Sequence, residues 1–209
     1  MSRFYVLPFL ALSALLVTSC FTPQASGPRV TRINPDAQVD ISGNWNDTDA
    51  NLVSKTMIRD CLSRPWAAQF KGKAGKDPVV KLYPIKNRSE EHIKTKYFTK
   101  QVEMELVNSG TVQVVAASDE TGAARAERRD QGRHASDLTK KENQNETGSD
   151  FVLNGWIISQ DDKAVVGGQE RAVRAYVVTM ELINVETQRK VWMKVHRLKK
   201  VVSRAASAW

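Results

Sequence analysis

The clearest indication of the fold is the sequence near the C-terminus, where residues 172–202 read AVRAYVVTMELINV, then ETQR, then KVWMKVHRLKKVV. The two outer runs, residues 172–185 and 190–202, are rich in β-branched side chains and alternate in part between apolar and polar residues. The four residues between them are polar and connect the two runs directly. This pattern predicts a β-hairpin.

Three shorter runs upstream of the hairpin predict further strands, over residues 79–85, 112–117 and 151–159. The third run is rich in β-branched and aromatic residues, and Gly155 within it indicates that another part of the chain approaches closely. Residues 160–171 are polar and contain two consecutive glycines, so we predict a loop there.

Two helices are predicted among these strands. The first is an apolar run at helical spacing over residues 50–62, which the capping residues 46–48 precede and Pro65 ends. The second starts at Ser89, a favourable N-cap that two glutamates follow, and ends at Gly110.

The second helix has two apolar faces. Phe98, Val102 and Leu106 form one stripe. On roughly the opposite side lie Ile93, Tyr97, Met104 and Val107. Two apolar faces imply two packing partners: we expect the sheet to be one, and the other is either a neighbouring helix or a foreign protein.

Residues 119–146 are polar with few apolar anchors and predict a weakly packed helical region. On a helical wheel, four arginines gather on one face, while Glu120, Glu127 and Asp130 gather on the other. The arginines are Arg125, Arg128, Arg129 and Arg133. This arginine face is either the solvated side of a helix or the contact for an acidic partner surface or an anionic polymer.

The predicted order is therefore helix, strand, helix, strand, helical region and three strands. This order describes an α/β (α+β) fold, in which helices pack on a single mixed β-sheet of about four to five strands that ends in the C-terminal hairpin. No internal repeat is visible in the sequence.

The N-terminal residues have the pattern of a lipoprotein signal peptide over residues 1–19. Arg3 precedes an apolar run over residues 4–17, which is too short to span a membrane because a spanning helix needs roughly twenty residues. The sequence Val-Thr-Ser-Cys at residues 17–20 has the form of a lipobox. We therefore predict that Cys20 is lipidated, with a chance cysteine at the end of an ordinary secretory signal as the alternative.

Residues 20–39 contain three prolines and little apolar periodicity, which predicts a flexible tether between the lipidated cysteine and a globular domain over residues 40–209. Phe21, rather than an aspartate, follows the cysteine. By the usual sorting pattern this indicates an anchor in the outer membrane, with the domain facing the periplasm. Fully extended, the nineteen residues between Cys20 and the domain reach about 65 Å.

Removal of the signal peptide would leave 30 basic and 23 acidic side chains and a net charge of +7. With Cys20 lipidated, Cys61 would be the only free thiol, and it shares a helical stripe with three apolar residues, which indicates a core position. We also interpret Trp66, Trp156 and Trp192 as core residues rather than as binding hot spots.

The sequence contains no arrangement of residues that indicates catalysis. The three histidines, at positions 92, 134 and 196, are far apart and lack the spacing of a metal site, and no nucleophile elbow or phosphate-binding loop is present. We therefore predict no enzymatic activity, no cofactor and no metal. The positive charge favours an acidic protein surface, a wall polymer or phospholipid headgroups over nucleic acid, which an exported chain seldom meets.

Short motifs follow one another in a characteristic order over residues 40–200. They are Asn44-Trp45-Asn46 before Leu52-Val53-Ser54-Lys55, then Asn87-Arg88-Ser89, Leu106-Val107-Asn108-Ser109-Gly110, Asp150-Phe151-Val152-Leu153, Leu182-Ile183-Asn184-Val185-Glu186-Thr187 and Lys190-Val191-Trp192. With these motifs the chain resembles the globular domain of LpoB-type outer-membrane lipoproteins. The resemblance implies a monomeric domain that binds a periplasmic bifunctional penicillin-binding protein and stimulates its peptidoglycan synthesis.

Two features depart from that family's pattern. Gln188 occupies the hairpin position where a glycine is typical, and the tether is short for a protein that must reach through the cell wall. The same general fold also resembles periplasmic lipoproteins of curli-type secretion. A secretion or scaffold lipoprotein that oligomerises at the outer membrane is therefore the alternative function.

Overall fold

The computed structural model describes residues 30–34, 37–40, 42–166 and 169–205. The chain divides into two compact units, Met1–Pro35 and Asp36–Trp209. Residues 30–34 of the first unit form no helix or strand and are exposed. The predicted signal peptide and Cys20 lie outside the described residues. Within the residues that the structure describes, no helix is long and apolar enough to cross a membrane.

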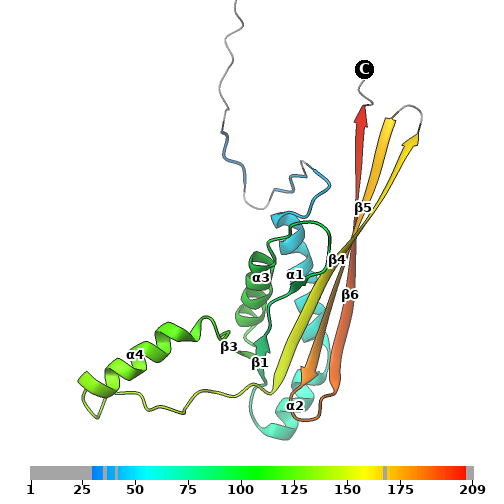
Figure 1. Ribbon diagram of the computed structural model, residues 1–209. Coiled ribbons are helices and arrows are strands. Elements are labelled where there is room, and N and C mark those ends of the chain that lie inside the picture. The colour runs from blue at the N-terminus through cyan, green and yellow to red at the C-terminus, as the bar shows by residue number, and fades with distance from the viewer. Residues whose placement is uncertain (1–29, 35–36, 41, 167–168, 206–209) are drawn as a thin grey trace, which may run out of the picture. The chain divides into compact units, whose positions relative to one another are not determined.

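Three long antiparallel strands form the larger part of the sheet (Figure 1). They are β4 (Phe151–Val166), β5 (Gln169–Asn184) and β6 (Lys190–Ala205). β5 and β6 form the predicted C-terminal hairpin. In its turn, Gln188 has a φ of 59°, in the left-handed region that favours glycine, and its side chain donates a hydrogen bond of 2.7 Å to the carbonyl of Val185. This local bond compensates for the unfavourable backbone conformation.

We predicted a loop over residues 160–171, but residues 160–166 belong to β4 and residues 169–171 to β5. Asp161 pairs with Arg174 in the register, and the guanidinium donates two hydrogen bonds to the carboxylate, at 2.7 and 2.6 Å. This part of the sheet extends beyond the helices (Figure 1). Strands with both faces in water need no apolar side chains, so the polarity of these residues led to a wrong prediction.

The remaining strands are short. They are β1 (Val79–Leu82), β2 (Lys86–Asn87) and β3 (Gln113–Val115). The sheet has the order β3-β1-β4-β5-β6, with β2 also paired to β4, and β1 runs parallel to both of its neighbours. The strand predicted over residues 79–85 ends at Leu82, ahead of Pro84, which has no amide hydrogen to donate. The sheet is mixed, as predicted, and over the described residues it has six strands, where we expected about four to five.

The described part of the chain contains four helices beside the sheet. They are α1 (Asp47–Ser63), α2 (Trp66–Ala74), α3 (Thr95–Asn108) and α4 (Thr121–His134). α1 starts with a capping box, in which the Asn46 side chain accepts from the Asp49 amide at 3.0 Å and the Asp49 carboxylate accepts from the Asn46 amide at 2.9 Å. α2 was not predicted, because Pro65 both ends α1 and directly precedes α2, where its missing amide hydrogen costs nothing.

α3 starts at Thr95 rather than at Ser89. The hydroxyl of Ser89 bonds with the side chain of Asn87 at 2.6 Å and the carbonyl of Glu91 at 3.1 Å, so it stabilises a turn and caps no helix. The predicted apolar stripe of α3 is fully buried. On its opposite side, however, Tyr97, Met104 and Val107 are exposed. The neighbouring helix of α3 is α1, whose Asn51 side chain accepts a hydrogen bond from the Tyr97 hydroxyl at 3.5 Å, but it leaves these three side chains uncovered.

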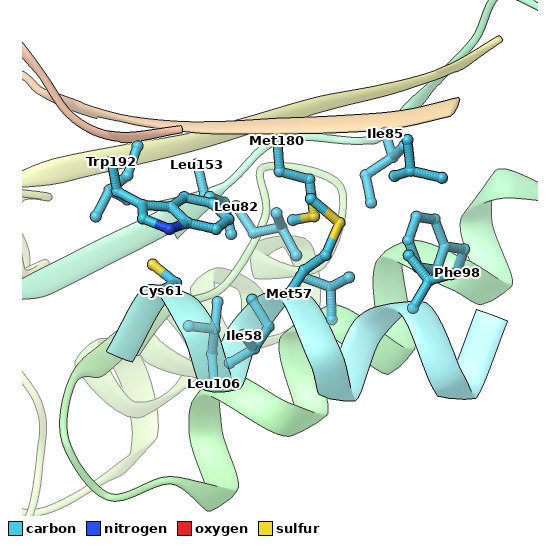
Figure 2. Packing of buried hydrophobic residues seen from close by; sticks show 14 of the residues in the cluster. Met57, Ile58, Cys61, Leu82, Ile85, Phe98, Leu106, Leu153, Met180 and Trp192 are labelled. Atoms are coloured by element: carbon cyan, nitrogen blue, oxygen red, sulfur yellow. The ribbon is translucent and has the colours of Figure 1, made fainter. Parts of the chain in front are cut away.

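One hydrophobic core lies between the sheet and α1, α2 and α3. Figure 2 shows Met57 and Cys61 of α1 directed at Met180 and Trp192 of the sheet, while Ile58 lies beside Leu106 of α3. Cys61 and Trp192 are buried, as predicted, and burial raises the pKa of the Cys61 thiol to about 12, which makes it unreactive. The three helices thus cover one face of the sheet.

Gly155 confirms the predicted close approach. A Cβ atom at this position would lie 3.0 Å from the Cγ of Met180 and 3.4 Å from a side-chain carbon of Ile85. Because this space is filled, only glycine lets β4 pass beneath these two core residues.

Candidate partner-binding surface

α4 is the element that carries the predicted arginine face, and none of its fourteen residues is buried. An ion pair joins its N-terminal end to the rest of the domain: Glu120, immediately before the helix, bonds to Lys100 of α3. In Figure 1, α4 lies beside β3, away from β4 to β6. A helix with so little burial adds little to the hydrophobic core, so its sequence is free to serve another purpose.

The structure brings two of the four predicted arginines together on an internal partner. Arg125 donates two hydrogen bonds to the carboxylate of Glu146, at 2.9 and 2.8 Å, and Arg128 donates a third at 3.2 Å. The bond from Arg125 lowers the pKa of Glu146 to about 2. Arg129 and Arg133 are exposed and form no ion pair within the described residues. Two of the four arginines thus remain free for a partner.

A shallow hollow connects α4 with the sheet. Its lining includes Arg125, Arg128 and Glu146 from this polar region and Lys81 and Val115 from β1 and β3. Lys81 and Val115 pair across the two strands. The basic surface of α4 therefore continues onto the sheet.

The face of the sheet opposite α1, α2 and α3 carries an aromatic residue that we predicted in the core. Trp156 is half-buried, and its ring lies 5.0 Å from the guanidinium carbon of Arg88. Strand alternation explains the wrong prediction, because Leu153 and Ile157 point to the core and Trp156, one residue out of phase, points to the other face. Because the run over residues 151–159 is apolar on both faces, its sequence does not indicate which alternate residues face the core.

A family model described as "Peptidoglycan-synthase activator LpoB" matches residues 49–197. The chain belongs to the LpoB family. Among solved structures it is similar to the LpoB C-terminal domain from Escherichia coli, with 16% identity over 73% of this chain and 99% of that chain and a TM-score of 0.43. It is also similar to E. coli LpoB solved by NMR (15% identity, 94% of both chains, TM-score 0.40).

A further similar structure is lipoprotein GNA1162 from Neisseria meningitidis, with 12% identity over 59% of this chain and 83% of that chain and a TM-score of 0.35. No curated protein sequence matches the chain.

In this LpoB-family domain, Lys200 joins the start of the folded unit to β6. Its ammonium donates to the carboxylates of Asp40 at 2.8 Å and Asp49 at 2.6 Å and to the carbonyl of Asn44 at 3.1 Å. Three donors thus meet three acceptors, and only 10% of the lysine side chain is exposed. This cluster fixes the place where the predicted tether enters the domain.

A second polar cluster adjoins the first. The buried Tyr176 donates its hydroxyl hydrogen to Glu91, which also accepts from Arg174 at 3.4 Å and from the Trp45 amide at 2.9 Å. Burial and the neighbouring carboxylate raise the pKa of Tyr176. Because each of these groups has a partner within the domain, the cluster has a structural role.

The described residues include no group of three or more histidine, cysteine, aspartate or glutamate side chains that could hold a metal ion. His92 precedes α3, His134 ends α4 and His196 lies in β6, so the three histidines are on separate elements.

Proposed function

We propose that this chain is an outer-membrane lipoprotein, anchored through Cys20, whose domain binds a periplasmic bifunctional penicillin-binding protein and stimulates its synthesis of peptidoglycan. The observation that carries the proposal is the family match, which spans residues 49–197 and so extends from α1 into β6. The lipobox at residues 17–20 supports the anchor.

An activator of this kind needs no catalytic group of its own. It stimulates the synthase only if it binds the active conformation more tightly than the resting one, and a tenfold shift requires a difference of about 1.4 kcal/mol in binding free energy. A domain with one continuous core and a hydrogen-bonded sheet suits this role, because little of the binding free energy is lost in ordering it.

The tether sets a geometric condition on the partner. Nineteen residues separate Cys20 from Asp40, which Lys200 fixes to β6, and they span about 65 Å at most. The synthase must therefore present its docking domain within this distance of the outer membrane, extended by the distance from Asp40 to the binding surface of the domain.

Lipidation is tested separately from activation. We expect cells that express the full chain to incorporate labelled palmitate into it and to retain it in the outer-membrane fraction. A Cys20→Ala chain is expected to lose the label and the membrane association, since one residue carries the anchor. Retention of the label in that variant would contradict the anchor.

Activation is tested by polymerisation of lipid II with the organism's own bifunctional synthase, with and without the chain from residue 21 onward. We expect a several-fold increase in rate that saturates with concentration. A heat-unfolded sample of the chain serves as the control. An unchanged rate, together with a large defined oligomer in light scattering after size exclusion, would reject activation in favour of the scaffold alternative.

A further inference from the structure

The side chains of β4, β5 and β6 that point away from α1, α2 and α3 form what we call the open face. Its centre consists of Trp156, Ile158, Val177, Thr179, Met193 and Val195. They are contiguous, since Trp156, Thr179 and Val195 occupy one cross-strand row and Ile158 and Val177 the next. Ile158 is 41% exposed and Met193 53% exposed, so water reaches an apolar surface in the middle of the sheet.

No helix of the described part of the chain covers the centre of the open face. The core residues of α1, α2 and α3 pack on the opposite face, and α4 lies to the side of β3 (Figure 1). A continuous apolar surface of this kind on a soluble domain is typical of an interaction site.

Basic side chains border the open face. They are Lys81, Lys86, Arg88, Arg197 and Lys199. Two of them lie over aromatic rings, Arg88 over Trp156 and Lys81 over Tyr83, at 5.0 and 5.9 Å. Tryptophan, tyrosine, methionine and arginine are the residues that protein interfaces favour. The border is therefore both positively charged and suited to tight contact.

Two acidic side chains in the described part of β4, β5 and β6 belong to the open face. Asp162 is exposed and lies away from the centre, in the row of Val173 and Val201, next to the row of Lys199. Glu181 lies in the cross-strand row of Met193 but is only 8% exposed, and its Oε2 is 2.6 Å from the ammonium of Lys190, without the geometry of a hydrogen bond. The five basic side chains of the border thus outnumber one exposed carboxylate, and the net charge that a partner meets is positive.

We propose that the open face is the surface by which this domain binds the synthase, and that the part of the synthase seated on it has an apolar centre with an acidic border. This inference rests on the function proposed above. The positive charge of the border favours the synthase over a second copy of this chain. In a symmetric dimer the same face of both copies would meet, and the two basic borders would repel each other. An anionic polymer would match the border but not the centre.

The position of α4 gives it a secondary part in this contact. The hollow between α4 and Lys81 joins the arginine face to the basic border. Charges at the rim of an interface mainly change the rate of association, whereas the centre determines how long the complex lasts. The arginines of α4 therefore steer the synthase, and the open face holds it.

The test uses two pairs of matched variants of the chain from residue 21 onward. Met193→Glu and Arg197→Glu alter the open face, while Met104→Glu on α3 and Arg59→Glu on α1 make the same changes at exposed positions elsewhere. Binding to the synthase and stimulation of lipid II polymerisation are measured for each, together with the thermal unfolding midpoint.

We expect Met193→Glu and Arg197→Glu to weaken binding at least about tenfold with an unchanged unfolding midpoint, and both controls to stay within about twofold of the wild type. If the wild-type chain stimulates the synthase and the open-face variants do so equally, the inference is wrong and the proposed function stands. If the wild-type chain neither binds nor stimulates it, both fall. Dissociation of an oligomer by the same variants would assign the face to a second copy and overturn the inference.

Discussion

The two faces of β4, β5 and β6 differ in what they contact, although their residues alternate along the same strands. On the covered face, Leu153 and Met180 are completely buried against the helices, whereas Met193 on the open face is half-exposed under a basic border. One set of alternate positions therefore determines the fold, and the other set is free for recognition.

The largest effect is expected from a pair of methionines on opposite faces. Met180→Ala leaves a cavity beneath Gly155 and is expected to lower the free energy of unfolding by about 3 kcal/mol. Met193→Ala removes a side chain that is half in water and is expected to cost less than about 1 kcal/mol. Urea unfolding measures both values. Equal losses would show that the two faces do not differ.

Two adjacent lysines of β6 give the next contrast. Lys200→Met leaves the buried carboxylate of Asp49 without its ion-pair partner and is expected to destabilise the domain by about 2 kcal/mol. Lys199→Met, on the open face, is expected to change stability by less than about 0.5 kcal/mol. The thermal unfolding midpoints of the two variants measure this difference, and similar midpoints would contradict the role of the Lys200 cluster.

The covered face contributes to the pH dependence of stability through Asp60. Its carboxylate forms an ion pair with Lys194 and accepts a hydrogen bond from the Trp192 indole, both at 2.9 Å, and these contacts lower its pKa below the unfolded value of about 4. A lowered carboxyl pKa contributes stability that is present above about pH 4 and is lost as the pH falls. Asp60→Asn is therefore expected to show a shallower loss of stability below pH 4 in urea unfolding. An unchanged slope would assign the acid sensitivity to other groups.

The smallest effect is expected at α4. Arg129→Glu reverses a free charge at the rim and is expected to slow association with the synthase by about threefold at low salt, with little change in dissociation rate or stability. Surface plasmon resonance at two salt concentrations measures the rates. A large increase in the dissociation rate would place α4 in the centre of the interface.

The sequence predicted the parts of this fold that have a strong local signal. The capping residues before α1 and the alternation over residues 172–202 identified the first helix and the hairpin, because both patterns reflect local geometry. The strand residues 160–166 and 169–171 were predicted as a loop, since strands that are exposed to water show no apolar periodicity.

The candidate surface was harder to predict than the fold. The pairing of Arg125 with Glu146, 21 residues away, depends on how a polar segment returns to α4 and has no local signal in the sequence. Trp156 was assigned to the core because its hydrophobicity is visible in a sequence, whereas the face of the strand it occupies depends on register. Only the structure shows that it lies with Met193 and Val195 on the open face.

Site-specific photo-cross-linking of the full chain in cells tests the role of the open face most directly. A photoreactive residue is placed at Val195 on the open face or, as the matched control, at Val107 on α3, which is also exposed. The account predicts an adduct with the bifunctional synthase from position 195 and none from position 107. An adduct with the synthase from position 107 alone, or an adduct between two copies of this chain from position 195, would contradict it.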